Sequence, residues 1–582
     1  MARPPTQLAK SPIALAGLAL LIMAGLMLGP ITQETATVDE TTYMGGGYAY
    51  FRTGSAKMAE EQPLLLQMIL AAPLLLQDVH ISEAAQDLME QRSFSPLAWR
   101  WTGGIAGRLE QVFPEGVNWY HFGLPEAQYF GQILVYDPQN KADRLMLSAR
   151  LVALLLTIGA GAFLFYWTVN LTHDTWASLM ATVLWAFNPV ALAYGHLAIT
   201  EPGISLAFPA AVWWFGRTLR NPSFTNAILL GILMALALEL KIVGVLLWPF
   251  FAFLLVALWI IRRKESQTGF LALSFVQLLR RVALVVAGFW GAILIIYFPH
   301  WSAPPPIAPA QAEVLKVPDW FVTLRPLLVP GNFFKSVTLK TLHSQSGADS
   351  FLMGKWSARG WRYYYPLAFW FKTPIPLLAL TVIAAGLLLR RSRQIEFPSL
   401  LPWLMAIFFM LVSLISTINL GVRHVYPVYP LLAVGVADQV ARVNRRWRVG
   451  AWFLCGWLII IAISSYPFYI PYCNEFAGGT SGGYKCLIDS NYDWGQDGER
   501  LKAWVEKNHV QHIYLDYFGT QASIEWLKIP NTRVDAERAR QLRDGWLVVS
   551  VSQLMRPEWA WLRESRKPDT RIAYTLFVYR LT

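Results

Sequence analysis

The chain has 582 residues, of which 55% are hydrophobic and only 15% are charged, and its mean hydropathy is +0.37. A protein that met water on all sides would need more polar residues to cover its surface, so this composition excludes a water-soluble enzyme and indicates a polytopic membrane protein. The net charge of +12 argues little for nucleic acid binding, because the basic residues of membrane proteins gather in their cytoplasmic loops.

Apolar runs long enough to cross a bilayer, taken as roughly 17–25 residues, recur about eleven times along the chain. The first run reads as an uncleaved span rather than a signal peptide, because it is long and no small-residue cleavage site follows it. The predicted spans are Ser11–Ile31, Leu145–Val169, Trp176–Ala193, Leu197–Phe215, Ala227–Leu240, Ile242–Ile261, Val282–Phe298, Pro374–Leu389, Pro398–Thr417, Val425–Val440 and Val449–Tyr466.

The short loops set the orientation of the chain. Arg3 and Lys10 precede the first span. If successive loops alternate between the two sides of the membrane, almost all of the remaining short basic clusters fall on the same side as Arg3 and Lys10. Positive-inside bias makes that side cytoplasmic. Three large segments then lie outside, at 32–144, 299–373 and 467–582, so we predict a transmembrane domain over 1–466 and an extracytoplasmic domain over 467–582.

The outer segments carry structure of their own. Gln62–Gln77 is amphipathic and bounded by charge, which favours a helix along the membrane interface rather than across it. The tail has a helical pattern at Gly498–Asn508 and apolar strand-like runs at His512–Phe518, Gly545–Val551 and Arg571–Tyr579. It is therefore expected to be a small α/β domain.

The residues most informative about function are ionisable groups at the predicted outer membrane face. Burying charge in hydrocarbon costs several kcal/mol, so such groups usually face a cavity or a partner. They are Asp39, Glu40, Glu60, Glu61, Glu201, Glu239, Lys241, Lys372, Arg423 and His424. Several of them have a simpler explanation: an outer Lys or Arg that snorkels to the headgroups, a helix cap or solvated loop at Asp39–Glu40, a neutralising Glu239–Lys241 pair, or a packed His424. Their clustering at one face instead favours a site for an anionic lipid headgroup together with a base.

Several motifs resemble those of lipid-carrier-dependent glycosyltransferases, the protein O-mannosyltransferase-like members of glycosyltransferase family 39. VDETTYMGGGYAYFRTG from Val38 is similar to their first outer loop, and AYGHLAITEPG, which ends at Gly203, to their second acidic motif. FLMGKWSARGWRYYYPLAFWFKTPIP from Phe351 and GVRHVYPVYPLLAV from Gly421 are similar to their later motifs. In the tail, the segment YCNEFAGGTSGGYKCLIDSNYDWGQD resembles the start of the extracytoplasmic domain in one bacterial branch of this family.

The resemblance implies a GT-C-like membrane fold in a bacterial plasma membrane and an inverting transfer of a sugar. The donor would be a polyprenyl-phosphate sugar and the acceptor a protein or a glycolipid, with no nucleic acid partner. A departing phosphate needs no general acid, but the acceptor needs a base and the phosphate needs cations. Asp39 is the candidate base, with Glu40 and Glu201 as further catalytic carboxylates. The predicted substrate-binding residues are Glu61, Lys241, Tyr364, Lys372, Arg423 and His424.

The chain also departs from the family pattern. Gln62, Pro63 and Leu64 stand where His-Pro-Pro is usual, Tyr43 replaces a common His, and the second acidic residue is Glu201. Because His is the preferred nitrogen ligand of transition metals, we predict no metal site, although a hard divalent cation held by carboxylates and phosphate stays open.

Other interpretations stay open as well. A transporter or flippase of a lipid-linked anion would also gather cations in the membrane, but it should show paired halves with interrupted helices. A catalytically inactive scaffold is a third class. Within the tail, Asp493 and Asp497 are expected to hold a turn rather than bind substrate. Cys473 and Cys486 are candidates for a disulfide in an oxidising compartment.

Overall fold

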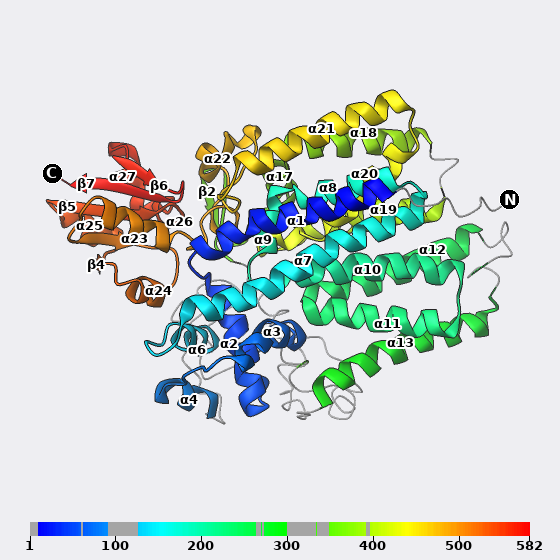
Figure 1. Ribbon diagram of the computed structural model, residues 1–582, viewed down its shortest axis with the longest axis horizontal. Coiled ribbons are helices and arrows are strands. Elements are labelled where there is room, and N and C mark those ends of the chain that lie inside the picture. Colours follow the sequence, from blue (N-terminus) through cyan, green and yellow to red (C-terminus); the bar gives the residue numbers. More distant parts are fainter. Residues whose placement is uncertain are drawn as a thin grey trace.

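The structure is a computed structural model that describes residues 10–59, 62–90, 126–262, 269, 273–298, 333, 348–391 and 396–581. A bundle of long helices occupies most of the molecule, and a small domain with a β-sheet lies at one end of its long axis (Figure 1). Helix α1 (Lys10–Gln33) starts far from this domain and runs toward it (Figure 1). The last long helix ends at Ser464, and the strands of this sheet lie between Ile513 and Leu581.

Within the described residues, four helices are long and apolar enough to cross a membrane, or six if each of two bent pairs counts as one span. These four are α1, α7 (Ala142–Thr172), α13 (Phe275–Tyr297) and α21 (Arg445–Ser464). The bent pairs are α8 (Thr175–Ala186) with α9 (Pro189–Gly195), and α17 (Tyr364–Lys372) with α18 (Ile375–Arg390). The chain therefore has the helices of a membrane protein, while the count of about eleven spans stays a prediction.

The other predicted spans correspond to helices that are shorter or less apolar than these. The fourth is α10 (Thr200–Arg220), the fifth is α11 (Phe224–Leu240), and the sixth is a 3₁₀ turn, η3 (Ile242–Leu246), continued by α12 (Leu247–Arg262). The ninth and tenth are α19 (Phe397–Ser413) and α20 (Val428–Ala441).

Local sequence explains where several of these helices begin. The Asn188 side chain accepts a hydrogen bond from the Val190 amide, with Pro189 in the first turn of α9. This cap, at the sequence Phe-Asn-Pro, ends α8 and turns the chain by 60°. The predicted third span, Trp176–Ala193, is thus broken rather than continuous. Ser274 starts α13 with a capping box that it forms with Gln277.

The first outer segment is largely helical where the structure describes it. Helix α2 (Val38–Thr53) contains three consecutive glycines and packs against α3 (Leu64–Ala71) and α6 (Glu126–Val135). A Cβ on Gly45 would lie 2.7 Å from the Gly131 Cα, and a Cβ on Gly131 would lie 2.2 Å from the Thr41 carbonyl oxygen. The backbones of α2 and α6 are therefore in direct contact, which only glycine permits.

The amphipathic segment at 62–77 forms α3 and the 3₁₀ helix η2 (Ala72–Leu76), so its helical character is confirmed. Its apolar side chains are largely buried in the protein, because Leu64, Leu66, Leu70 and Leu74 are each at most 2% exposed. Helix α4 (Glu83–Glu90) completes this outer layer. A two-stranded antiparallel hairpin, β1 (Ser350–Leu352) with β2 (Lys355–Ser357), precedes α17.

The tail is a small α/β domain, as expected. Its mixed sheet has the strand order β4-β3-β5-β7-β6, in which β3 is parallel to β4 and β5, and β7 is antiparallel to β5 and β6. The strands are β3 (Ile513–Asp516), β4 (Asn531–Arg533), β5 (Gly545–Ser550), β6 (Thr570–Ile572) and β7 (Leu576–Leu581), and the helices are α22 (Gly479–Gly482), α23 (Gly498–Lys507), α24 (Gln521–Trp526), α25 (Ala536–Gln541), α26 (Val551–Leu554) and α27 (Ala560–Ser565).

The predicted helix and two of the predicted strands are confirmed as α23, β3 and β5, but the third strand is not a single element. Arg571–Tyr579 turns back on itself between β6 and β7, where Ala573 and Tyr574 have positive φ angles of 52° and 69°. Hydrophobicity alone gives no sign of this hairpin, because both of its strands contribute side chains to the same core.

Buried carboxylates hold the start of the tail, as predicted for Asp493 and Asp497. Asp493 accepts hydrogen bonds from the Ser550 hydroxyl (2.8 Å) and the Ser552 amide (3.0 Å), and Asp497 accepts one from the Thr575 hydroxyl (2.6 Å). The same segment bonds to the end of α1, where the Thr35 amide donates to the Gln496 carbonyl at 2.9 Å. All three cysteines, Cys455, Cys473 and Cys486, are free thiols, so the structure contains no Cys473–Cys486 disulfide.

The buried Asp493 carboxyl should make the stability of the tail depend on pH. Burial raises its pKa from 3.8 to about 7. The folded chain therefore keeps a proton that the unfolded chain loses, and the resulting stabilisation is present below about pH 4 and lost as the pH rises through about 7. In the wild type the free energy of unfolding should fall by about 1.4 kcal/mol per pH unit in this range, and Asp493→Asn should abolish that slope. The measurement is hydrogen exchange of β5 between pH 5 and pH 8 in the full-length protein. The exposed Asp544, changed to Asn, is the control, and an unchanged pH slope in Asp493→Asn would contradict the assignment.

Candidate active site

Four of the predicted charges meet in the structure, although they lie far apart in the sequence. Arg423 Nη1 lies 2.9 Å from Asp39 Oδ2 and 3.9 Å from Glu201 Oε1. Lys241 Nζ lies 2.6 Å from the same Glu201 oxygen. The expected convergence of Asp39, Glu201, Lys241 and Arg423 is therefore confirmed. These residues form the cluster called here the acid–base site.

Each member of the acid–base site stands at the end of a helix or in a short turn. Asp39 lies in the first turn of α2, which begins with a capping box between Thr37 and Glu40. Glu201 lies in the first turn of α10, and Lys241 occupies the extended joint between α11 and η3. Arg423 belongs to η7 (Val422–Val425), the 3₁₀ turn before α20.

Burial divides the acid–base site into an outer edge and an inner layer. The side chains of Asp39 and Arg423 are 20% and 11% exposed, whereas Glu201 and Lys241 are 0% and 4% exposed. Glu201 also accepts a hydrogen bond from Thr200 Oγ1 (3.0 Å), and Lys241 donates to the Arg423 carbonyl (3.3 Å). A substrate would therefore meet Asp39 and Arg423 first, with the inner pair behind them.

The predicted Glu239–Lys241 pair is wrong, because Lys241 pairs with Glu201. Glu239 instead accepts a hydrogen bond from the Tyr297 hydroxyl at 3.2 Å and interacts with the backbone amides of Leu64 and Leu65. Those amides belong to the first turn of α3, where the helix dipole favours a negative charge. Glu239 therefore links α11 to α3 and α13.

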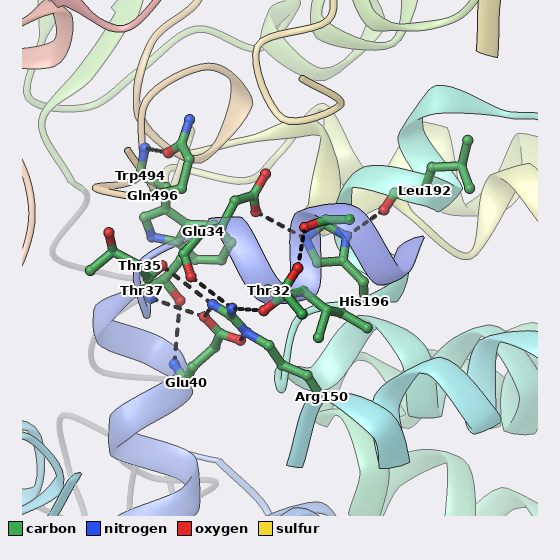
Figure 2. A network of polar contacts seen from close by, with 12 residues as sticks. Thr32, Glu34, Thr35, Thr37, Glu40, Arg150, Leu192, His196, Trp494 and Gln496 are labelled. Atoms are coloured by element: carbon green, nitrogen blue, oxygen red, sulfur yellow. Dashed lines mark hydrogen bonds and ion pairs between the residues drawn. The ribbon is translucent and has the colours of Figure 1, made fainter. Parts of the chain in front are cut away.

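Glu40 lies beside Asp39 in the sequence but turns into a separate buried network (Figure 2). Its carboxylate receives two bonds from Arg150, at 2.8 and 2.9 Å, and two more from the amides of Thr37 and Ala198, each at 2.9 Å. Burial would raise the pKa of Glu40, but Arg150 and these amides together lower it. With both oxygens occupied, Glu40 has the geometry of a structural anchor rather than of a second catalytic carboxylate.

Arg150 extends the same network to the end of α1. Its guanidinium donates to the carbonyls of Ile31 and Glu34, each at 2.8 Å, and to that of Thr35 at 3.3 Å. The Glu34 side chain contacts His196 Nε2 at 2.9 Å, as Figure 2 also shows. Arg150 thereby fixes the joint between α1 and α2, and with it the position of Asp39.

The remaining predicted residues lie behind the acid–base site or outside the described residues. The Lys372 ammonium donates to the backbone carbonyls of Ile470 (2.7 Å), Tyr472 (2.5 Å) and Asn491 (2.7 Å), so its three protons are all used. It fastens α17 to the tail. Glu61, together with Glu60, lies outside the described residues.

Tyr364 and His424 also stand close to the tail and to η7. The Tyr364 hydroxyl accepts a hydrogen bond from Asn491 Nδ2 at 3.0 Å. The His424 ring lies 6.1 Å from the ring of Tyr365, and its backbone amide donates to the Gly421 carbonyl at 3.1 Å. Both residues therefore surround the turn that carries Arg423.

Sequence reasoning missed several residues that shape the acid–base site. Two residues of the tail contact Arg423 directly. The Ser490 hydroxyl oxygen lies 3.3 Å from Arg423 Nε, and the ring centre of Trp494 lies 4.4 Å from Arg423 Cζ. Asp489 stands beside them with a positive φ of 57°, and burial raises its pKa to about 6. The sequence DSNYDWGQD, which begins at Asp489, contains all three of these residues, but its Asn, Asp and Gly indicate only a turn. Among the described residues, no three His, Cys, Asp or Glu side chains gather as a metal-binding group.

Comparisons with known proteins follow this geometry. Residues 118–301 match the sequence model of the family described as dolichyl-phosphate-mannose-protein mannosyltransferase. This range includes Glu201 and Lys241, and the match confirms the resemblance found in the motifs. No curated protein matches the chain as a relative.

Solved structures with a similar arrangement have low sequence identity. ArnT from Cupriavidus metallidurans bound to undecaprenyl phosphate is 12% identical, covers 98% of each chain and has a TM-score of 0.48. The same protein in the apo state is 13% identical, covers 97% of each chain and has a TM-score of 0.45. The oligosaccharyltransferase AglB from Archaeoglobus fulgidus, in complex with an inhibitory peptide and a dolichol-phosphate, is 13% identical over 93% of this chain and 69% of its own, with a TM-score of 0.43.

The buried Arg150–Glu40 pair should be needed for folding. Arg150→Met removes the guanidinium and leaves Glu40 as an uncompensated buried charge, which we expect to destabilise the protein by about 3–5 kcal/mol. Thermal unfolding of the purified protein in detergent measures this loss. The control is Arg566→Met, which breaks the Arg566–Asp569 pair (3.3 Å), whose side chains are both exposed. Equal unfolding temperatures for Arg150→Met and the wild type would contradict the structural role of the pair.

Proposed function

We propose that this chain is a GT-C-like membrane glycosyltransferase that moves a sugar from a polyprenyl-phosphate carrier to an acceptor on the extracytoplasmic face. The observation that carries the proposal is the Arg423 guanidinium, which is partly exposed and lies between Asp39 and Glu201. A carboxylate and a cation at one accessible edge suit a reaction that takes up a proton and releases a phosphate. The family match over residues 118–301 supports the same reaction class.

In the proposed reaction an acceptor hydroxyl attacks the anomeric carbon of the sugar. The new bond forms between that carbon and the acceptor oxygen, while the bond to the carrier phosphate breaks and its electron pair leaves with the phosphate. Asp39 takes the proton of the acceptor hydroxyl, and Arg423 holds the departing phosphate through its forked donors. A single displacement of this kind inverts the anomeric centre.

In the structure, the Arg423 guanidinium pairs with Asp39 at 2.9 Å. A donor phosphate would compete with Asp39 for the guanidinium, and its arrival would loosen the carboxylate that has to accept a proton. The inner Lys241–Glu201 pair keeps Arg423 in place, since Lys241 donates to its backbone carbonyl. In this proposal the donor therefore binds before the acceptor can react.

Asp39 should be required for chemistry and not for folding. Asp39→Asn keeps the size of the side chain and its first-turn position but removes the base, so we expect transfer to fall by about 10²–10⁴-fold. The assay is release of free polyprenyl phosphate from a polyprenyl-phosphate sugar in the presence of acceptor. The control is Asp174→Asn, which alters a carboxylate that pairs with Arg448 at 2.8 Å. Full turnover in Asp39→Asn would remove Asp39 from this role.

Arg423 should act mainly on the donor. Arg423→Ala removes the side chain that would bind the phosphate. We expect KM for the lipid-linked sugar to rise by at least about tenfold, because one charge-assisted hydrogen bond to the donor is lost. Arg448→Ala, which removes an arginine from the Asp174 pair, is the matched control. Protein that carries the lipid-linked substrate across a vesicle membrane without releasing polyprenyl phosphate would instead indicate the transporter class.

A further inference from the structure

Arg423 is held in place by a segment of the tail as well as by the helical bundle. Ser490 Oγ accepts a hydrogen bond from Arg423 Nε at 3.3 Å, and the indole of Trp494 lies against the guanidinium at 4.4 Å from its centre to Cζ. Trp494 is 6% exposed and Ser490 is fully buried. These contacts engage the Nε edge and one face of the guanidinium, while Nη1 points to Asp39.

The same segment holds the backbone of the turn that carries Arg423. Ser490 Oγ donates to the Leu420 carbonyl at 2.9 Å, and Asn491 Oδ1 accepts from the Val422 amide at 2.8 Å. A Cβ on Gly421 would lie 2.3 Å from Ser490 Oγ, so the two segments pack backbone against side chain without spare room.

The helical bundle in turn fixes the tail segment. The Tyr194 hydroxyl at the end of α9 donates to the Ser490 carbonyl at 2.7 Å, and its ring lies edge-on to Trp494 at 6.5 Å. Asn491 Nδ2 donates to the Tyr364 hydroxyl at 3.0 Å. The segment is thus anchored on both sides of Arg423, which is more contact than a linker between two domains requires.

We propose that Ser490, Asn491 and Trp494 are positioning residues of Arg423, so that the extracytoplasmic domain completes the donor-phosphate site. Arginine side chains have many rotamers, and holding the guanidinium by its Nε edge and one face, rather than by the Nη side that points to Asp39, lowers the entropy lost when phosphate binds. The indole supports the cation without competing for its hydrogen-bond donors, since it offers only a π face. This inference rests on the proposed function, because it assumes that Arg423 binds the phosphate of the donor.

The first test is removal of the aromatic face. For Trp494→Leu we expect KM for the polyprenyl-phosphate sugar to rise by about two- to thirtyfold, the range of a cation–π contact, with a smaller change in kcat. Trp494→Phe keeps an aromatic face and should restore part of the loss. The matched control is Trp546→Leu, which removes another tail tryptophan under an arginine, Arg580, at 5.5 Å. A donor KM for Trp494→Leu equal to that of the wild type would overturn the proposal.

Ser490→Ala is a smaller change that keeps the assignment testable if Trp494→Leu folds poorly. It removes the bond to Arg423 Nε, and we expect a rise in donor KM of about three- to tenfold. Ser523→Ala is its control, because Ser523 is a buried serine of the tail whose side chain bonds only locally. Its hydroxyl donates to the Thr520 carbonyl, and its amide donates to the Thr520 hydroxyl.

A double-mutant cycle separates positioning from general stability. If Trp494 acts through Arg423, then Trp494→Leu should not weaken binding further once Arg423→Ala is present. Binding of a polyprenyl phosphate to the full-length protein in lipid nanodiscs is measured for the wild type, both single variants and the double variant. If the losses of binding free energy in the two single variants add up in the double variant, the positioning role is overturned. It is also overturned if Arg423→Ala loses binding while Trp494→Leu binds as well as the wild type. A wild-type protein that binds no polyprenyl phosphate would overturn the proposed function, and this inference with it.

Discussion

The arrangement of this protein depends on the cost of burying ionised groups away from water. A buried charge is tolerated only where an opposite charge or several hydrogen bonds compensate it. Arg423 meets this condition by contacting carboxylates from two distant helices, Asp39 at 2.9 Å and Glu201 at 3.9 Å. The ion pairs of the acid–base site therefore also hold together the helix ends that form it.

Two buried ionisable groups make their polar contacts without an opposite charge, and both connect parts of the fold. Lys372 is surrounded by three carbonyl oxygens of the chain that leads into and begins the tail. Glu239 meets the Tyr297 hydroxyl and the first-turn amides of α3. Each group exchanges water for backbone hydrogen-bonding partners on another segment. These contacts can therefore form only after the two segments have docked. They are consequences of assembly as well as contributors to it.

The sequence predicted where charge would gather but not how it would pair. Asp39, Glu201, Lys241 and Arg423 could be recognised because charges at a membrane face are costly and conspicuous. The pairing of Lys241 with Glu201 rather than Glu239 depends on how α10 and α11 rotate against each other, which hydropathy does not report.

The same limit applies to backbone bends and to the tail. The break between α8 and α9 needs the Asn-Pro cap at position 188 to be recognised within an apolar run. Contacts of Ser490 and Trp494 with Arg423 depend on docking of the tail, which no local pattern encodes. By contrast, α23 was predictable because it buries one face at helical spacing, and β3 and β5 because they are short apolar runs.

The glycine contact between α2 and α6 has a consequence for how sequences of this kind can vary. Gly45 and Gly131 face each other at a distance that leaves no room for a methyl group on either side. Since α2 also carries Asp39 in its first turn, any enlargement at this crossing would move the proposed base by a fraction of an ångström or more. Because each added methyl group would meet backbone atoms, no change at one position can make room for the other, and both positions should remain glycine among functional relatives.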